Sequence, residues 1–105
     1  MKLAAIVGLT ALMFSHVAAA DATFEKGKKV FMEAKPACSV CHTLADAGSA
    51  GQIGPNLDEL APSMKQVKAA VSSGVGVMPS FQDSLSSDDI NAVAHYVAKV
   101  TGGGK

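Results

Sequence analysis

The sequence is poor in several residue types on which other classes of protein depend. Its 105 residues include no Trp and no Arg, one Tyr and two Cys. Basic and acidic residues balance at nine each, so no basic excess indicates a nucleic-acid partner. With so few aromatic side chains, a chain of this size is short of apolar bulk for a core. We therefore expect a bound group to supply part of the core.

The start of the chain has the pattern of an export signal. Lys2 precedes an apolar run over residues 3–14, and Ala18 and Ala20 have the spacing of a signal-peptidase site. The run is too short for a comfortable transmembrane anchor, which is the alternative interpretation. We therefore expect residues 1–20 to be a cleaved secretory signal peptide and residues 21–105 to form one periplasmic domain. Lys2 leaves with the signal while every acidic residue stays, so the mature chain is slightly negative.

Three stretches of the mature chain have the period of amphipathic helices. They cover about residues 23–34, 63–73 and 86–101. Ser63 with Gln66 fits a capping box at the second start, and Ser86 caps the third. Glycine-containing loops at 43–57 and 74–84 separate the helices, and no useful strand pattern is present. The sequence predicts a small all-α domain.

Both cysteines lie in the segment CSVCH, where Cys38 and Cys41 are followed at once by His42. A structural zinc site needs four ligands, and only His95 could join these three in the mature chain. A thioredoxin-type redox site belongs to a βαβ setting, which the helical pattern does not offer. A structural disulfide between the two cysteines would close a very short loop and stabilise little.

Covalent haem attachment is the interpretation that the segment favours, because C-x-x-C-H is its signature. Two thiols three residues apart on a helical turn can each add to one vinyl group of a porphyrin. The next residue then presents its imidazole to the iron. The motif therefore predicts one haem c, held by thioether bonds from Cys38 and Cys41 and by His42 as an iron ligand. The haem would also supply the missing apolar bulk.

With these residues the chain resembles the class I c-type cytochromes, of the small bacterial monohaem type, over nearly its whole mature length. The resemblance implies a fold of three main helices wrapped around one covalently bound haem. IGPNL at 53–57 is similar to the segment in which a proline, here Pro55, accepts a hydrogen bond from the proximal histidine. GVGVMPSF at 74–81 is similar to the distal loop, which implies Met78 as the sixth ligand of the iron.

The resemblance also assigns packing roles to several residues. Gly27 and Phe31 match the place where the first helix crosses the last, and Tyr96 matches the aromatic residue of the last helix. Gly27 would allow the close approach, and the two rings would fill the space around it. Phe81 is expected in the core near the haem edge.

Two other side chains compete with Met78 for the iron. Met64 fits the apolar face of its helix, where a core position is the usual fate of a methionine. His95 lies in the third helix and is expected at the surface or the rim of the site. Met78 lies instead in a glycine-rich loop before Pro79, which restrains its backbone.

His/Met ligation would leave the iron no open position for oxygen, peroxide or substrate, so the resemblance implies a one-electron carrier and not an enzyme. The implied donor is a periplasmic dehydrogenase, and the acceptor is a cytochrome oxidase or another cytochrome. The general pattern is similar to cytochromes that accept electrons from molybdenum-containing sulfite dehydrogenases. We expect a monomer with no membrane span after cleavage, whose lysines at 26–35 and 65–68 form solvated helix faces.

Two alternatives remain at this stage. A haem-based ligand sensor or a peroxidase-like protein would require Met78 to be absent from the iron or displaceable. A non-haem exported binding module would require a disulfide or a metal at Cys38 and Cys41.

Overall fold

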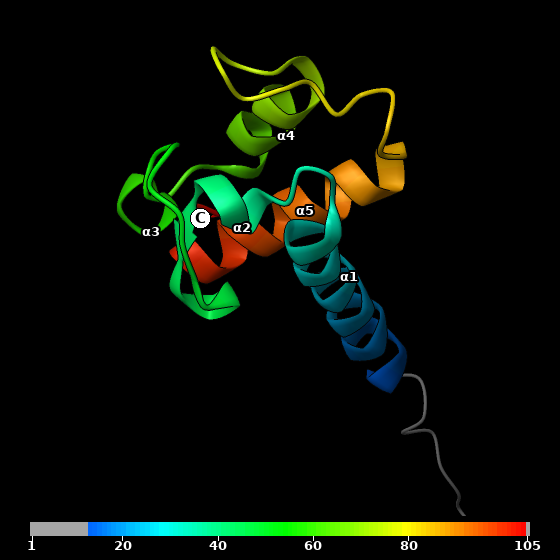
Figure 1. The fold of residues 1–105 in the computed structure, drawn as a ribbon. Helices are drawn as coiled ribbons and strands as arrows, with labels where there is room; N and C mark the ends of the chain where they lie inside the picture. The colour runs from blue at the N-terminus through cyan, green and yellow to red at the C-terminus, as the bar shows by residue number, and fades with distance from the viewer. Residues whose placement is uncertain (1–12, 105) are drawn as a thin grey trace, which may run out of the picture.

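A computed structural model describes residues 13–104, and they are mainly helical (Figure 1). The long helices are α1 (Met13–Glu33), α4 (Met64–Ser73) and α5 (Ser87–Thr101). The single-turn helices α2 (Cys38–Cys41) and α3 (Leu57–Leu60) lie between them. Strands β1 (Thr43–Leu44) and β2 (Ser49–Ala50) pair antiparallel around the 3₁₀ turn η2 (Ala45–Ala47), with Leu44 opposite Ser49. The expected all-α fold is confirmed, with one hairpin too short to leave an alternating pattern in the sequence.

Helix α1 begins earlier than the sequence pattern predicts. We expect a helix from about residue 23, whereas α1 begins at Met13 and continues through Ala20, the expected end of the signal peptide. The run of alanines at 18–20 has high helix propensity, which accounts for this continuation. Residues 1–12, most of the expected signal peptide, lie outside the described residues. Within the described part of the chain, no helix combines the length and the apolar character that crossing a membrane requires.

The main helix contact is between α1 and α5, which pack together at Gly27 (Figure 1). A Cβ at residue 27 would overlap the carbonyl oxygen of Ala92 and lie 2.6 Å from the Cβ of Tyr96. Only glycine lets the two backbones approach so closely. The rings of Phe24 and Phe31 meet the Tyr96 ring edge to face, at centroid distances of 5.0 and 6.0 Å. The expected packing of Gly27, Phe31 and Tyr96 at a helix crossing is what the structure has.

Helices α4 and α5 begin where their capping residues predict. The Ser63 hydroxyl accepts a bond from the Gln66 N–H (3.1 Å), and the Gln66 side chain accepts one from the Ser63 N–H (2.8 Å). Ser86 and Asp89 repeat the arrangement at the start of α5. Most of α5 is buried, and its buried residues are Ile90, Ala92, Val93, Ala94, Tyr96, Val97 and Ala98. Because α5 packs on α1, α3 and α4, it is the central element of the core.

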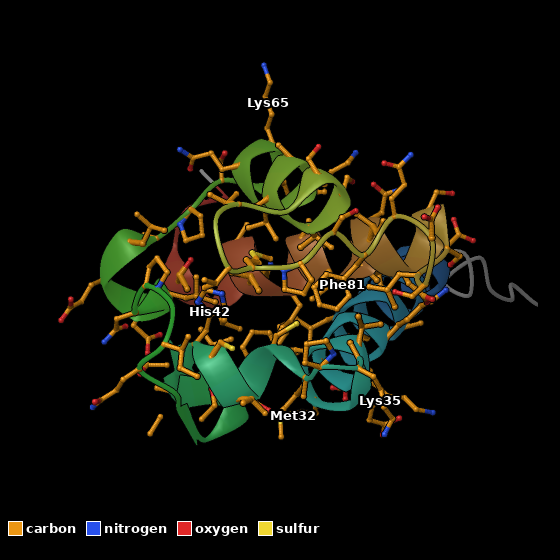
Figure 2. All side chains as sticks on the ribbon, turned by 45° about the horizontal axis from the view of Figure 1, so that its top comes forward. Met32, Lys35, His42, Lys65 and Phe81 are labelled. Carbon is orange, nitrogen blue, oxygen red and sulfur yellow. The ribbon has the colours of Figure 1, made fainter. Side chains whose placement is uncertain are left out.

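Asp46 in η2 links the segment that follows CSVCH to the place where α1 and α5 cross. The Tyr96 hydroxyl donates a hydrogen bond to Asp46 Oδ2 (2.6 Å), and Lys28 of α1 forms an ion pair with the same oxygen (3.5 Å). Lys26 pairs with Asp89 (3.6 Å), whereas Lys35 and Lys65 project away from the body of the molecule (Figure 2). The lysines at 26–35 and 65–68 therefore divide between local ion pairs and solvated positions.

Candidate cofactor site

An apolar cavity of about 520 Å³ opens between the helices, in the size range of small-molecule and cofactor sites. It is walled by α2 and the 53–60 segment, by α4 and the loop after it, and by parts of α1 and α5. Among the described residues, His42 and Gln66 are the polar side chains of its wall besides the two thiols. The lining residues are Phe31, Pro36, Ala37, Cys38, Cys41, His42, Ile53, Gly54, Pro55, Leu57, Leu60, Pro62, Gln66, Val67, Ala70, Val71, Val75, Val77, Met78, Pro79, Phe81, Val93 and Val97.

The cavity brings together nearly all the site residues expected from the sequence. Its lining includes both cysteines with His42, Pro55 and Met78, and it includes the buried rings of Phe31 and Phe81. Tyr96 is fully buried but does not line the cavity, so its part is helix packing.

The two rivals of Met78 lie elsewhere. His95 is half-buried in α5 and is absent from the cavity wall. Met64 is also absent from the wall, and it is 37% exposed at the first residue of α4. The expectation of a core position for Met64 is therefore wrong, because the apolar face of α4 buries only Val67 and Val71.

Helix α2 is a single turn that carries both cysteines. The His42 N–H donates to the Cys38 carbonyl (3.0 Å), and the backbone then becomes extended at His42, with φ −117° and ψ 138°. This four-residue turn brings both thiols to the same cavity, and the backbone changes direction directly after it, at His42. In Figure 2, His42 lies in the interior between α2 and α4.

The His42 ring is oriented by the segment that follows the hairpin. Its Nδ1 lies 2.8 Å from the carbonyl oxygen of Pro55. A carbonyl can only accept, so Nδ1 carries a proton, and in the neutral ring the lone pair is then on Nε2. The Gly54 N–H also donates to the Cys41 carbonyl (2.7 Å), which fixes this segment against α2. The ring is therefore held in the tautomer that a metal ligand needs, through a bond typical of metal-binding histidines.

Gly54 is a site residue that sequence reasoning missed. A Cβ at this position would lie 2.6 Å from His42 Cε1 and 3.0 Å from its Nδ1. A methyl group at position 54 would therefore push the imidazole from its place. The available signal is its place directly before Pro55 in the IGPNL segment.

Met78 is presented by a tight turn. The N–H of Val75 donates to the Met78 carbonyl (3.0 Å), and the N–H of Met78 donates to the Val75 carbonyl (2.9 Å). The N–H and the carbonyl of Met78 are thus both hydrogen-bonded, while its half-buried side chain lines the cavity.

The surroundings of the cysteines disfavour the other interpretations of CSVCH. Burial raises the pKa of the Cys38 thiol to about 11, with a smaller contribution from Cys41. A redox-active thiol of thioredoxin type needs the opposite shift. Across the described residues, no three His, Cys, Asp or Glu side chains are grouped as a metal ion would require. Two thiols, an oriented imidazole and a methionine around one large apolar cavity instead fit a haem.

Comparisons with known proteins agree with a haem cofactor. Residues 22–97 match the family model described as cytochrome c oxidase, cbb3-type, subunit III. Cytochrome c6 of Cladophora glomerata is 35% identical over 77 residues, which are 68% of this chain and 81% of that relative. The crystal structure of the c-type cytochrome SorU from Sinorhizobium meliloti is similar with a TM-score of 0.75 and 44% identity, covering 78% of this chain and 94% of that one.

Proposed function

This chain belongs to the family of c-type cytochromes and carries one covalently bound haem c, and on that premise we propose that it is a periplasmic one-electron carrier. In this proposal Cys38 and Cys41 would form the thioether bonds, and His42 and Met78 would be the protein ligands of the iron. The observation that carries the assignment is the 2.8 Å contact between His42 Nδ1 and the Pro55 carbonyl beside the two thiols. It leaves Nε2 as the free ligand atom of a ring that faces the apolar cavity.

The chain tunes and insulates the site. When bound, the haem supplies the reversible gain and loss of one electron. The Pro55 carbonyl keeps the imidazole in one tautomer and raises its basicity. A methionine ligand and a wall with few polar side chains both raise the reduction potential, because they disfavour the extra charge of the oxidised form. Because His42 and Met78 would both ligate the iron, we propose that no substrate is transformed there.

The partners that we propose are a periplasmic dehydrogenase as donor and a cytochrome oxidase or another cytochrome as acceptor. A sulfite dehydrogenase with a molybdenum centre is our candidate donor, on the resemblance described from the sequence. The mouth of the cavity supports brief docking, because Ile53, Val75 and Val77 are 66%, 64% and 87% exposed there. Small interfaces that release quickly are typical of electron-transfer encounters.

A visible spectrum of the mature protein tests the cofactor and its ligands. We expect sharp c-type bands after reduction with dithionite and, in the oxidised protein, the weak red band of a sulfur–ferric iron bond. A c-type spectrum without the red band would remove Met78 from the iron and would favour a ligand sensor or peroxidase-like protein. Absence of haem bands from protein matured with the haem-attachment machinery would contradict the proposal as a whole.

The donor is tested separately. Purified sulfite dehydrogenase with sulfite should reduce the oxidised protein within the turnover time of the enzyme, followed by the growth of the reduced bands. Reduction no faster than that of an unrelated c-type cytochrome would contradict this choice of donor and leave the carrier function in place.

A further inference from the structure

The loop that carries Met78 is fastened to the end of α4. We call residues 74–81 the Met78 strap. At its start, the Gly74 N–H donates to the Ala70 carbonyl (2.7 Å). At its far end, the Phe81 N–H donates to the Val71 carbonyl (2.8 Å), and the Ser80 hydroxyl donates to the Ser72 carbonyl (2.5 Å). The strap therefore leaves α4 and returns to it.

These anchors use carbonyl groups that every helix leaves free. The last four carbonyls of a helix have no partner within it, and in α4 they belong to residues 70–73. The first is capped by the strap's first residue, and the next two hold the strap's last two residues. The C-terminal end of α4 thus holds both ends of the Met78 strap by hydrogen bonds.

The two anchors at the far end differ in kind. Phe81 is a buried core residue, 4% exposed, and its ring lines the cavity. Its replacement would disturb the core together with the strap. Ser80 is exposed, and its side-chain contacts are the bond to Ser72 and a longer one from the Gln82 N–H (3.3 Å). The Ser80 hydroxyl therefore ties the strap down without forming part of the core.

We propose that Ser80 is a positioning residue for the sixth ligand, because its bond to the Ser72 carbonyl keeps the Met78 strap closed over the cavity against competing ligands. The argument rests on the proposed ligation by Met78. Both backbone groups of Met78 are bonded to Val75, so Met78 withdraws together with the 75–78 turn. Ser80 follows that turn by two residues and is the fastening nearest to Met78 on its C-terminal side. Without it, the strap can lift while the Phe81 side chain stays in the core.

Competition with imidazole tests the proposal. The oxidised holoprotein is titrated with imidazole, and replacement of Met78 is followed by the loss of the red sulfur–iron band. Because an exposed hydrogen bond contributes modestly, we expect Ser80→Ala to bind imidazole about three- to tenfold more tightly than the wild type. Ser80→Thr retains the hydroxyl and should restore the wild-type affinity.

Ser84→Ala is the matched control. Ser84 lies beyond the strap, and its hydroxyl donates to the Phe81 carbonyl of its own turn, at 3.5 Å. The same chemical change there should leave imidazole affinity unaltered. Thermal unfolding of all three variants measures any general loss of stability, so that it can be compared with the change in imidazole affinity.

The outcomes are distinct. Tighter imidazole binding in Ser80→Ala, with Ser80→Thr and Ser84→Ala like the wild type, would support the proposal. Equal affinity in Ser80→Ala and the wild type, with the red band present, would overturn it and leave the electron carrier intact. Absence of the red band from the wild type would overturn ligation by Met78 and the proposal with it.

Discussion

Single residues fix the geometry around His42, and Gly54 is the least replaceable of them. A Cβ there would lie 2.6 Å from the ring, so Gly54→Ala should displace the imidazole and weaken its bond to Pro55. A less basic ligand stabilises the oxidised iron less well. We expect the reduction potential to rise by roughly 20–60 mV, the equivalent of a hydrogen bond of about 0.5–1.5 kcal/mol.

A potentiometric titration of the holoprotein measures this shift. Gly104→Ala is the control, because the atom nearest to a Cβ there is 3.6 Å away. Equal potentials for Gly54→Ala and the wild type would show that the ring tolerates the methyl group and that the close approach has no electronic consequence.

Tyr96 links the crossing of α1 and α5 to the β1–β2 hairpin, and it makes the free energy of unfolding depend on pH in the alkaline range. Burial, and then the hydrogen bond to Asp46, raise the pKa of Tyr96 above its ordinary value of about 10. A pKa that is higher in the folded state stabilises the fold fully below the unfolded pKa. This contribution is lost as the pH rises above about 10 toward the folded pKa.

Tyr96→Phe should therefore cost about 1–2 kcal/mol at neutral pH, by removing the bond to a carboxylate. Its difference from the wild type should shrink as the pH rises above about 10. Urea unfolding between pH 7 and 11 measures both effects. The lysines also titrate in this range, but they are the same in both proteins, so their contribution drops out of the difference in unfolding free energy. A difference that stays constant over this range would contradict the assigned role of the hydroxyl.

Local sequence signals predicted some site residues and not others. Cys38, Cys41 and His42 could be predicted from the sequence, because covalent haem attachment requires these residue types close together at a set spacing. The role of Gly54 could not be predicted in this way, because it depends on the His42 ring, twelve residues away in the chain. Asp46 was missed for the same reason, since its partners Lys28 and Tyr96 come from two distant helices.

At the scale of elements, the helix starts depend on their caps. Ser86→Ala removes the side-chain acceptor of the Asp89 N–H and should cost about 1 kcal/mol of unfolding free energy. Ser87→Ala is the control, because Ser87 is exposed at the first residue of α5 and does not form the cap. Urea unfolding of the holoprotein compares the two. Equal losses would show that the capping box at Ser86 contributes nothing beyond a general effect of removing serine.

The elements were predicted best where the sequence carries stop and start signals. Ser63 and Ser86 predict the starts of α4 and α5, which begin one residue later, at Met64 and Ser87. The start of α1 was placed too late, because alanine-rich sequence continues a helix without any signal at its boundary. The β1–β2 hairpin has two residues a strand, too few for a period to show.

The part of the molecule that the structure describes is built around the apolar cavity. Without haem, the apolar wall of this cavity of about 520 Å³ would lie against water instead of against a bound group, which disfavours the folded state. We therefore expect the double variant Cys38→Ala, Cys41→Ala, expressed without haem attachment, to lack a cooperative fold. Far-ultraviolet circular dichroism during a urea titration measures this, with the holoprotein as reference. A helical apoprotein with a sharp unfolding transition would contradict the expectation.

The exposed tip of the Met78 strap, combined with the scarcity of cysteine, makes this molecule easy to label. Val77 is 87% exposed on a turn fastened at its base by backbone hydrogen bonds. The sequence has two cysteines, and haem attachment consumes both. A Val77→Cys variant of the holoprotein would thus carry a single reactive thiol. A fluorophore or spin probe attached there would stand at the mouth of the cavity and report each encounter with a redox partner as it happens.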